Sequence, residues 1–165
     1  QTCALPIFGR AISHRFVAEG ATVLAVDIDD RALAVLADEL GDRVYTMHCD
    51  VTDERSLEAV ASRATSLGGL TVAVANAGKG TYSPVVDHSL DEWRSVLDLC
   101  LTGVFLTVKH AGRVMHDGGS IITIASLNAI QPAEGMSAYC AAKAGVAMFT
   151  QVAAMELGQI GRAHV

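Results

Sequence analysis

The chain has 165 residues and a mass of 17.2 kDa, which fits a single domain. Hydrophobic residues make up 51% of it and charged residues 18%, so a chain that is disordered throughout is excluded. The formal net charge of −6 argues against nucleic acid as a partner, because phosphate contacts need clustered Lys and Arg. No apolar run reaches the roughly 18 residues of a membrane-spanning helix, so we expect no membrane partner.

Four cysteines are scattered along the chain, namely Cys3, Cys49, Cys100 and Cys140. Their spacing matches no metal site, so we expect free thiols and no bound metal. A secretory signal begins with charged residues followed by a long apolar stretch, and we find no such pattern in the sequence. Together these features predict a cytoplasmic protein, since that compartment keeps thiols reduced.

The two ends differ in character from the sequence between them. Residues 1–7 and 160–165 read as translations of a sequencing-library adapter. The DNA string for the second end is the reverse complement of part of the string for the first, which independent natural ends rarely show. We therefore expect natural sequence from about residue 8 to about residue 158, as one partial domain truncated at both ends.

Between these ends, helical periodicity alternates with short apolar runs typical of strands. In chain order we predict a helix over 10–19, a strand over 22–26, a helix over 29–40, a strand over 43–47, a helix over 53–67, a strand over 71–75, a long helix that begins after Ser89, a strand over 120–125 and a helix over 137–157. Thr52 is the expected N-cap of the third helix. Ser89 and Glu92 form a predicted capping box for the fourth.

Strands that alternate with helices of this length predict an α/β fold with a doubly wound parallel sheet. The predicted strands are apolar throughout, which is typical of a sheet with helices on both faces. Ligands of such sheets bind beyond the carboxyl ends of the strands. Most of the candidate functional residues fall at those ends.

Tyr139 and Lys143 are four residues apart on the last predicted helix, so both side chains lie on one face. A cation beside a phenol favours the phenolate, which prepares the phenol to exchange a proton. The same spacing also occurs in ordinary surface pairs, so the pair alone is weak evidence. Ser126 ends the fourth predicted strand, where its hydroxyl can meet a substrate oxygen or merely turn the chain.

Other polar residues follow the earlier strands. Asp27 ends the first predicted strand, where a carboxylate can accept hydrogen bonds from ribose hydroxyls or simply start a helix. Asp50 follows the second strand, and either contacts an adenine or precedes the cap at Thr52. The segment Asn76-Ala77-Gly78 follows the third strand and is equally compatible with a structural turn.

In this order and at these spacings, the residues resemble the short-chain dehydrogenase/reductase family, over roughly the first two-thirds of its usual length. The motifs that carry the resemblance are Gly9-Arg10-Ala11-Ile12, Ala25-Val26-Asp27-Ile28, Asp50-Val51, Asn76-Ala77-Gly78, Leu101-Thr102-Gly103-Val104-Phe105, Ser126 and Tyr139-Cys140-Ala141-Ala142-Lys143. The resemblance implies a partial dinucleotide-binding and catalytic domain with a Rossmann-like sheet that is incomplete here. The strand that opens the family's sheet, before the helix over 10–19, is largely replaced, and the C-terminal strands are missing.

The resemblance also implies roles for three catalytic residues. Tyr139 corresponds to the general acid and base that gives a proton to a carbonyl oxygen or takes one from an alcohol. Lys143 corresponds to the residue that favours the phenolate and holds the nicotinamide ribose. Ser126 corresponds to the hydroxyl that orients the substrate, a small-molecule carbonyl or alcohol.

Cofactor contacts follow from the same resemblance. Asp27 corresponds to the position that selects NAD over NADP, because its charge repels the extra phosphate of NADP. The remaining positions implied to contact the cofactor are Gly9, Asp50, Val51, Asn76, Ala77, Gly78, Tyr139 and Lys143. The implied function is an NAD(P)-dependent oxidoreductase, active in the whole protein as a homodimer or homotetramer.

The sequence departs from the family in three places. The glycine motif would fall at positions 3, 7 and 9, but Cys3 and Ile7 carry side chains that should block close approach to the pyrophosphate. Cys100 stands where the family usually has an active-site asparagine, and a thiol is a poor substitute in hydrogen bonding. The third departure is that the chain stops after residue 158 of its natural part. We therefore expect low stability and weak or absent activity, and we keep a catalytically silent dinucleotide-binding or regulatory protein as the alternative.

Overall fold

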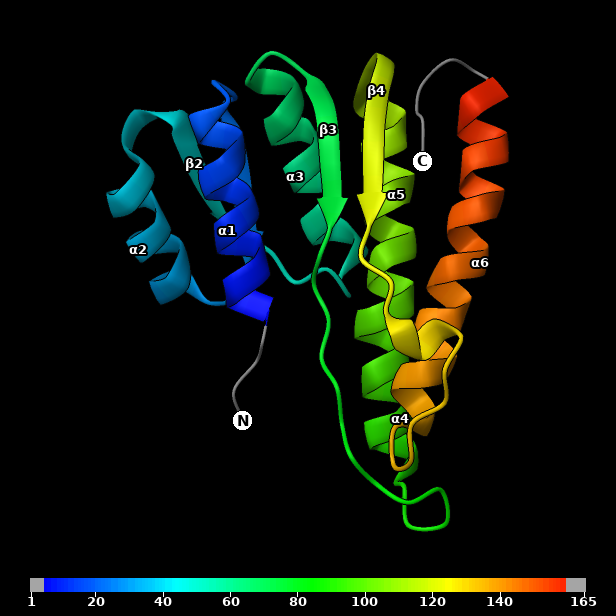
Figure 1. Cartoon of the computed structure of the whole chain (residues 1–165). Coiled ribbons are helices and arrows are strands. Elements are labelled where there is room, and N and C mark those ends of the chain that lie inside the picture. The colour runs from blue at the N-terminus through cyan, green and yellow to red at the C-terminus, as the bar shows by residue number, and fades with distance from the viewer. Residues whose placement is uncertain (1–4, 160–165) are drawn as a thin grey trace.

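The computed structural model describes residues 5–159, which form an α/β arrangement of helices around parallel strands (Figure 1). The helices are α1 (Leu5–Ala18), α2 (Asp30–Leu40), α3 (Glu54–Ser66), α4 (Leu90–Leu97), α5 (Gly103–Val114) and α6 (Ser137–Gln159). The strands are β1 (Val23–Asp27), β2 (Val44–His48), β3 (Leu70–Ala75) and β4 (Met115–Thr123). Three short turns of other helix types are η1 (Gly41–Arg43), η2 (Asp98–Thr102) and η3 (Leu127–Ala129).

The strands form two separate parallel pairs. β1 pairs with β2, with Val23 opposite Val44, and β3 pairs with β4, with Val74 opposite Ile122. No strand within residues 5–159 joins the two pairs. β1 and β3 therefore each leave one edge without a ladder partner, as the sequence predicts for a sheet whose first strand is replaced.

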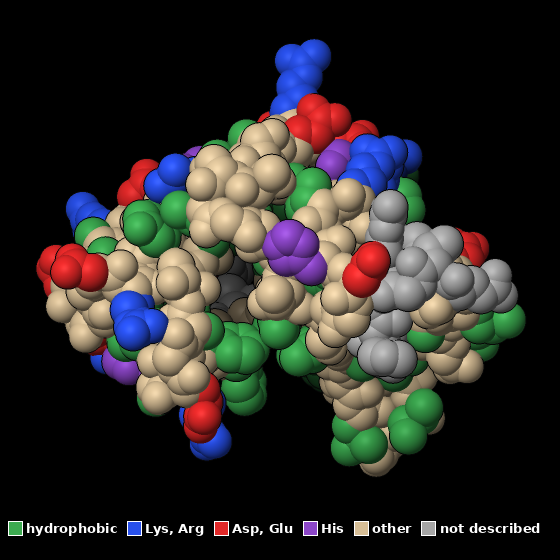
Figure 2. Space-filling view, turned by 90° about the horizontal axis from the view of Figure 1, so that it is seen from above, with side chains coloured by type: hydrophobic (Ala, Val, Ile, Leu, Met, Phe, Trp, Pro, Cys, Tyr) green, Lys and Arg blue, Asp and Glu red, His purple; other side chains and the backbone are tan. Residues whose placement is uncertain are grey.

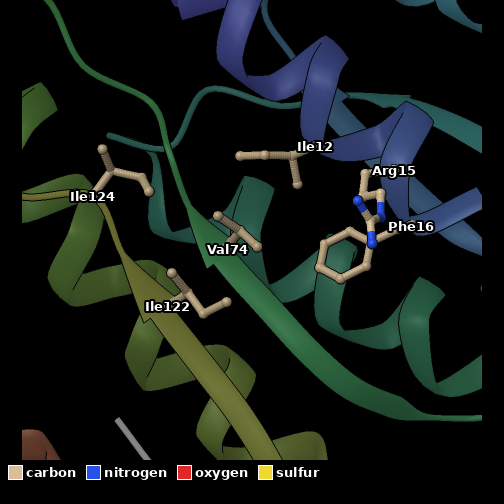
Figure 3. A pocket seen from close by; sticks show the side chains of 6 residues that line it. All are labelled: Ile12, Arg15, Phe16, Val74, Ile122 and Ile124. Atoms are coloured by element: carbon tan, nitrogen blue, oxygen red, sulfur yellow. The ribbon is translucent and has the colours of Figure 1, made fainter. Parts of the chain in front are cut away.

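An apolar groove separates α1 from the β3–β4 pair (Figure 3). It has a volume of about 280 Å³ and is lined by Ile12, Arg15, Phe16, Val74, Ile122 and Ile124. Ile122 is 42% exposed and Val72 is 37% exposed, so the expectation that helices cover both faces of every strand is wrong at these positions. Exposed apolar side chains beside open strand edges favour aggregation, in line with the low stability expected from the sequence.

The predicted helix and strand positions are confirmed to within a few residues at most ends. The largest differences are α1, which begins at Leu5 instead of residue 10, and β4, which begins at Met115 instead of residue 120. The N-cap predicted at Thr52 is wrong, because the Asp53 carboxylate accepts from the Arg55 amide and caps α3. The Thr52 hydroxyl instead donates to Asp50. The cap predicted at Ser89 is confirmed, since its hydroxyl accepts from the Glu92 amide.

The long helix predicted after Ser89 is interrupted. The π-helical turn η2 separates α4 from α5, with the Gly103 amide donating to the Asp98 carbonyl five residues earlier. Such turns insert one residue into a helix and often occur at functional sites. The helical spacing of apolar residues is the same before and after η2, so this turn could not be predicted from the sequence.

The main core lies where β3 and β4 pack against α5 and α6. Its buried members are Ala75, Val104, Val108, Ala111, Met115, Ile121, Val146 and Ala153. Ile121 is 1% exposed and Val146 is fully buried. A hydroxyl contact supplements the apolar packing, because Thr123 Oγ1 on β4 lies 2.7 Å from Thr150 Oγ1 on α6. Burial of this apolar surface contributes most of the free energy that fixes α6 against the strands.

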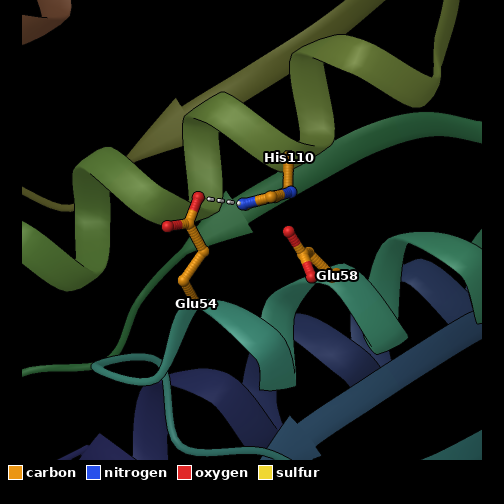
Figure 4. A group of neighbouring side chains, drawn as sticks. All are labelled: Glu54, Glu58 and His110. Atoms are coloured by element: carbon orange, nitrogen blue, oxygen red, sulfur yellow. Dashed lines mark hydrogen bonds and ion pairs between the residues drawn. The ribbon is translucent and has the colours of Figure 1, made fainter.

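Charged side chains join α3 to α5 (Figure 4). Glu54 Oε1 accepts from Lys109 Nζ at 2.5 Å and lies 3.0 Å from Nε2 of the buried His110. Glu58, one turn further along α3, brings its carboxylate to within 4.8 Å of the same group. The Lys109 ammonium lowers the pKa of Glu54, with His110 acting in the same direction. Lys109 already compensates the Glu54 charge, so the cluster acts as an ion-pair contact between helices.

The end of the molecule at which β3 and β4 begin carries acidic and basic side chains interspersed around its edge (Figure 2). Within the described part of the chain, no helix combines the length and the apolar character needed to cross a membrane.

Candidate active site

The carboxyl ends of β3 and β4 lie side by side and lead into the candidate site. The Ile124 amide donates to the Ala75 carbonyl at 3.1 Å, which extends the pairing one residue beyond β4. The segment Asn76–Gly78 continues from β3, and Ser126 follows two residues after Ile124. Both predicted segments therefore leave the sheet at the same edge, where ligands of parallel sheets bind.

Helix α6 brings Tyr139 and Lys143 to this edge. Lys143 is 4% exposed, and its Nζ donates to the Ile124 carbonyl at 2.6 Å. The same Nζ lies 5.7 Å from the centre of the Tyr139 ring. The structure thus places the ammonium between the tyrosine ring and the strand end that leads to Ser126. A surface pair, the alternative for this spacing, is excluded by the burial of Lys143.

The ammonium of Lys143 is held in an unfavourable environment for a charge. Burial lowers its pKa below the ordinary value of 10.5, and Cys100 acts in the opposite direction. Because the folded state gives up this proton at a lower pH than the unfolded state, stability rises with pH in the interval just below 10.5.

A comparison of the wild type with Lys143→Met tests this linkage. We expect the free energy of unfolding of the wild type to rise, relative to that of the variant, as pH increases from about 8 to about 10. Urea unfolding of both proteins across this interval measures the difference. Other groups that titrate there contribute equally to both proteins, so their effect on the free energy of unfolding is subtracted. A difference that stays flat or falls with pH would contradict the assignment.

Ser126 holds the start of η3 by local hydrogen bonds. Its Oγ accepts from the Asn128 amide at 3.1 Å and contacts Asn128 Oδ1 at 3.4 Å. Asn128 Nδ2 in turn donates to the Gln131 carbonyl. Among the described residues no hydrogen bond joins the Ser126 hydroxyl to the Tyr139 phenol. The Asn128 contacts were not predicted, although an asparagine two residues after a serine is a common turn signal.

The segment that follows β3 closely approaches both Gly9 on α1 and Lys143 on α6. A Cβ added at Gly9 would lie 3.3 Å from Asn76 Nδ2, and one added at Gly78 would lie 3.8 Å from Lys143 Nζ. Asn76 Oδ1 is buried without a hydrogen-bond partner. A buried orphan acceptor of this kind is normally satisfied by water or a ligand. Ala77 lies between Asn76 and Gly78 and is half-buried.

Asp27 and Asp50 lie at the ends of the other strand pair. The Asp27 carboxylate accepts from the Asp29 amide at 3.0 Å. The Asp27 backbone carbonyl accepts from the Cys49 backbone amide at 2.9 Å. Hydrogen bonds from Thr52 lower the pKa of Asp50. Val51 packs on Gly103, because a Cβ added at Gly103 would lie 2.9 Å from Val51 Cγ2. Within residues 5–159 no hydrogen bond joins either aspartate to the Tyr139 phenol.

The glycine-motif positions give a mixed result. Gly9 and Ile7 lie within α1, and the Ile7 side chain is 70% exposed. Cys3 lies outside the described residues. A helix at this point replaces the glycine turn that would face a pyrophosphate. The residues present therefore fit the nicotinamide side and the ribose side of a dinucleotide better than its phosphates.

The chain thus combines parallel strands and packed helices with a tyrosine and a buried lysine beside the strand ends. The family model described as enoyl-(acyl carrier protein) reductase matches residues 8–163. The chain belongs to the short-chain dehydrogenase/reductase family. The match begins directly after residues 1–7, while at the other end it continues into 160–165, and the adapter origin of both ends stays a prediction.

Relatives and solved structures agree with this assignment. The chain is 39% identical over 161 residues to the (5R,7aS)-5-hydroxy-7a-methyl-1-oxo-2,3,5,6,7,7a-hexahydro-1H-indene-carboxyl-CoA reductase of Mycobacterium tuberculosis, covering 93% of this chain and 62% of that protein. It is 38% identical over 158 residues to a 3-alpha-(or 20-beta)-hydroxysteroid dehydrogenase of the same organism, covering 93% and 61%.

Among solved structures, a short chain dehydrogenase from Mycobacterium smegmatis is similar with a TM-score of 0.90 and 34% identity, over 94% of this chain and 68% of that one. A glucose/ribitol dehydrogenase-type structure from Brucella melitensis has a TM-score of 0.91 and 30% identity. The predicted fold is thereby confirmed. The chain spans less than two thirds of the length of these two Mycobacterium tuberculosis relatives.

Proposed function

We propose that the chain forms the larger part of an NAD-dependent oxidoreductase that acts on a carbonyl compound or a secondary alcohol. The observation that carries the proposal is the buried Lys143 ammonium, held by the Ile124 carbonyl 5.7 Å from the Tyr139 ring. Two relatives named as a reductase and a hydroxysteroid dehydrogenase support the same chemistry. When bound, NAD supplies the hydride acceptor or donor.

In this proposal Tyr139 exchanges a proton with the substrate oxygen, and the positive charge of Lys143 favours the phenolate form. Ser126 donates a hydrogen bond to the same oxygen. Its 3.4 Å contact with Asn128 Oδ1 is at the limit of a hydrogen bond, so the hydroxyl proton is available to a substrate. The Asn128 amide holds Ser126 Oγ in place from the other side.

The cofactor would be held by residues that lie in two groups. Asn76, Gly78 and Lys143 border the space proposed for the nicotinamide riboside, and the orphan Asn76 Oδ1 supports a polar ligand there. Asp27 would accept from the adenosine ribose, with Asp50 and Val51 beside the adenine. Gly9 and Ala77 complete the set, and the helical segment at Ile7 lowers the expected affinity and activity.

We expect the chain to bind NADH about tenfold more tightly than NADPH, because the Asp27 carboxylate repels a 2′-phosphate. Asp27→Ala should narrow this ratio towards one. Asp38→Ala, on the exposed side of α2, removes the same charge and is the matched control. Titration of protein fluorescence measures both dissociation constants. Equal or tighter binding of NADPH by the wild type would contradict the assignment of Asp27.

The substrate would be apolar. Exposed apolar side chains lie on the segments that follow β3 and β4, namely Tyr82, Val85, Val86, Leu127 and Ile130. The Ser83 amide donates to the Gly135 carbonyl at 2.8 Å, so the two segments are in contact. Relatives named for an indene derivative and for hydroxysteroids are consistent with an alicyclic substrate.

Exposed apolar side chains on α5 and α6 support assembly of the whole protein into a dimer or tetramer, namely Phe105, Met148, Val152 and Met155.

A catalytically silent dinucleotide-binding protein is the second candidate. One observation favours it, which is that Cys100 replaces the asparagine usual in the family. A silent protein would bind NADH with the preference described above and transfer no hydride.

A further inference from the structure

The thiol of Cys100 is fully buried within η2 and meets both polar backbone groups of a single residue. Its Sγ lies 3.2 Å from the Lys79 amide, which donates to it. The thiol also donates to the Lys79 carbonyl at 3.2 Å. A thiol is a weak donor and a weak acceptor, yet here it fills both roles on one backbone segment that lies 21 residues away in sequence.

The residue held in this way, Lys79, lies in the segment that follows the end of β3 at Ala75. A Cβ added at Gly78 would lie 3.3 Å from Cys100 Sγ and 3.8 Å from Lys143 Nζ. The thiol, the Gly78 backbone and the ammonium are therefore packed around one point. A second hydrogen bond holds the Lys79 side chain, because its Nζ donates to Ser95 Oγ on α4, the helix directly before η2.

Cys100 also belongs to the contact between this segment and α6. It forms a buried cluster with Val96, Ala138 and Ala142, all of them 0% exposed. Ala138 and Ala142 directly precede Tyr139 and Lys143 along α6. The Cys100 side chain thus hydrogen-bonds to the backbone after β3 and also packs in a buried cluster against α6, the helix that carries Tyr139 and Lys143.

We infer that Cys100 is a positioning residue that fixes the distance between the Asn76–Lys79 segment and the Tyr139–Lys143 pair. It touches neither substrate nor cofactor, and it acts through the Lys79 backbone. The inference rests on the proposed function, because the segment matters for catalysis only if it borders the nicotinamide. It also means that a cysteine at this position supplies both hydrogen bonds that hold the turn, contrary to the expectation from sequence.

Hydrogen exchange of the Lys79 amide tests the hydrogen bonds directly in the chain as it exists. In Cys100→Ala we expect this amide to exchange at least about tenfold faster, because its acceptor is gone. Cys100→Ser keeps a donor and an acceptor and should stay within about threefold of the wild type. Cys49→Ala is the matched control, since Cys49 is 1% exposed and packs in a different cluster, with Leu57 and Leu106.

Titration with NADH supplies the second readout. We expect Cys100→Ala to weaken NADH binding about tenfold, and Cys49→Ala to leave it within about twofold. Equal exchange of the Lys79 amide in the two alanine variants would overturn the role of the thiol. Faster exchange with unchanged NADH affinity would show that the thiol holds the turn without positioning the site, which also overturns the inference. If the wild type binds no NADH, the proposed function fails, while the exchange data still decide whether Cys100 holds the turn.

Discussion

Replacement of Tyr139 by phenylalanine is expected to lower the turnover number about a thousandfold, because general acid and base catalysis typically contributes factors of about a hundred to ten thousand. Because the chain spans 62% of the 39%-identical Mycobacterium tuberculosis reductase, residues 8–158 would be joined to the flanking segments of that protein for this experiment. The phenylalanine ring keeps the packing beside Lys143 and loses only the hydroxyl. NADH affinity should therefore stay within about twofold of the parent value.

Tyr45→Phe is the matched control, because Tyr45 lies on β2 and is 39% exposed. Steady-state oxidation of NADH with an alicyclic ketone measures turnover in the three proteins. A Tyr139→Phe variant that retains turnover within about threefold of the parent chimera would contradict the role of the phenol. A parallel loss of NADH affinity would point instead to a structural role.

Ile121→Ala is expected to have the largest effect on stability, a loss of about 3 kcal/mol in the free energy of unfolding. Ile121 lies near the carboxyl end of β4, is 1% exposed and packs in the main core. Its truncation removes buried methyl groups and leaves a cavity between the strands and the helices. Since whole domains are stable by only about 5–15 kcal/mol, this single change should visibly lower the urea midpoint.

The adjacent Ile122→Ala is the control, because it removes the same atoms from a side chain that is 42% exposed. We expect it to cost less than about 1 kcal/mol. Urea unfolding followed by circular dichroism compares the two variants with the wild type. Equal losses for both would show that the β4 side chains are not packed as described.

Most of the fold could be predicted because periodicity reports burial directly. The leucines of α2 recur at helical spacing, and Leu33 and Leu36 are indeed buried. The aspartate cap at Asp53 was not separated from Thr52, since both residue types are common N-caps and the two residues are adjacent. The start of α1 differs because Pro6 and Gly9 predict a turn before residue 10, whereas a proline is tolerated in the first turn of a helix.

The candidate site could be predicted in part for a similar reason. Residues four apart on a helix share a face, so the sequence predicts that Tyr139 and Lys143 lie side by side. The ends of the predicted strands likewise place Asn76 and Ser126 at one edge of the sheet. The Ile124 carbonyl that holds Lys143 is a backbone group, which leaves no trace in the side-chain pattern. The dual hydrogen bonding of Cys100 depends on the π-helical turn, whose extra residue the apolar pattern does not reveal.

Transfer of deuterium from labelled NADH most directly tests whether the site is an oxidoreductase centre. With NADH deuterated at both positions of nicotinamide C4, the chimera should yield an alcohol that carries one deuterium on the former carbonyl carbon, in amounts equal to the NADH consumed. The Tyr139→Phe chimera should yield almost none over the same time. Tight NADH binding with no deuterium in the product of the parent chimera, across a panel of apolar ketones, would contradict the proposed function and favour a silent dinucleotide-binding protein.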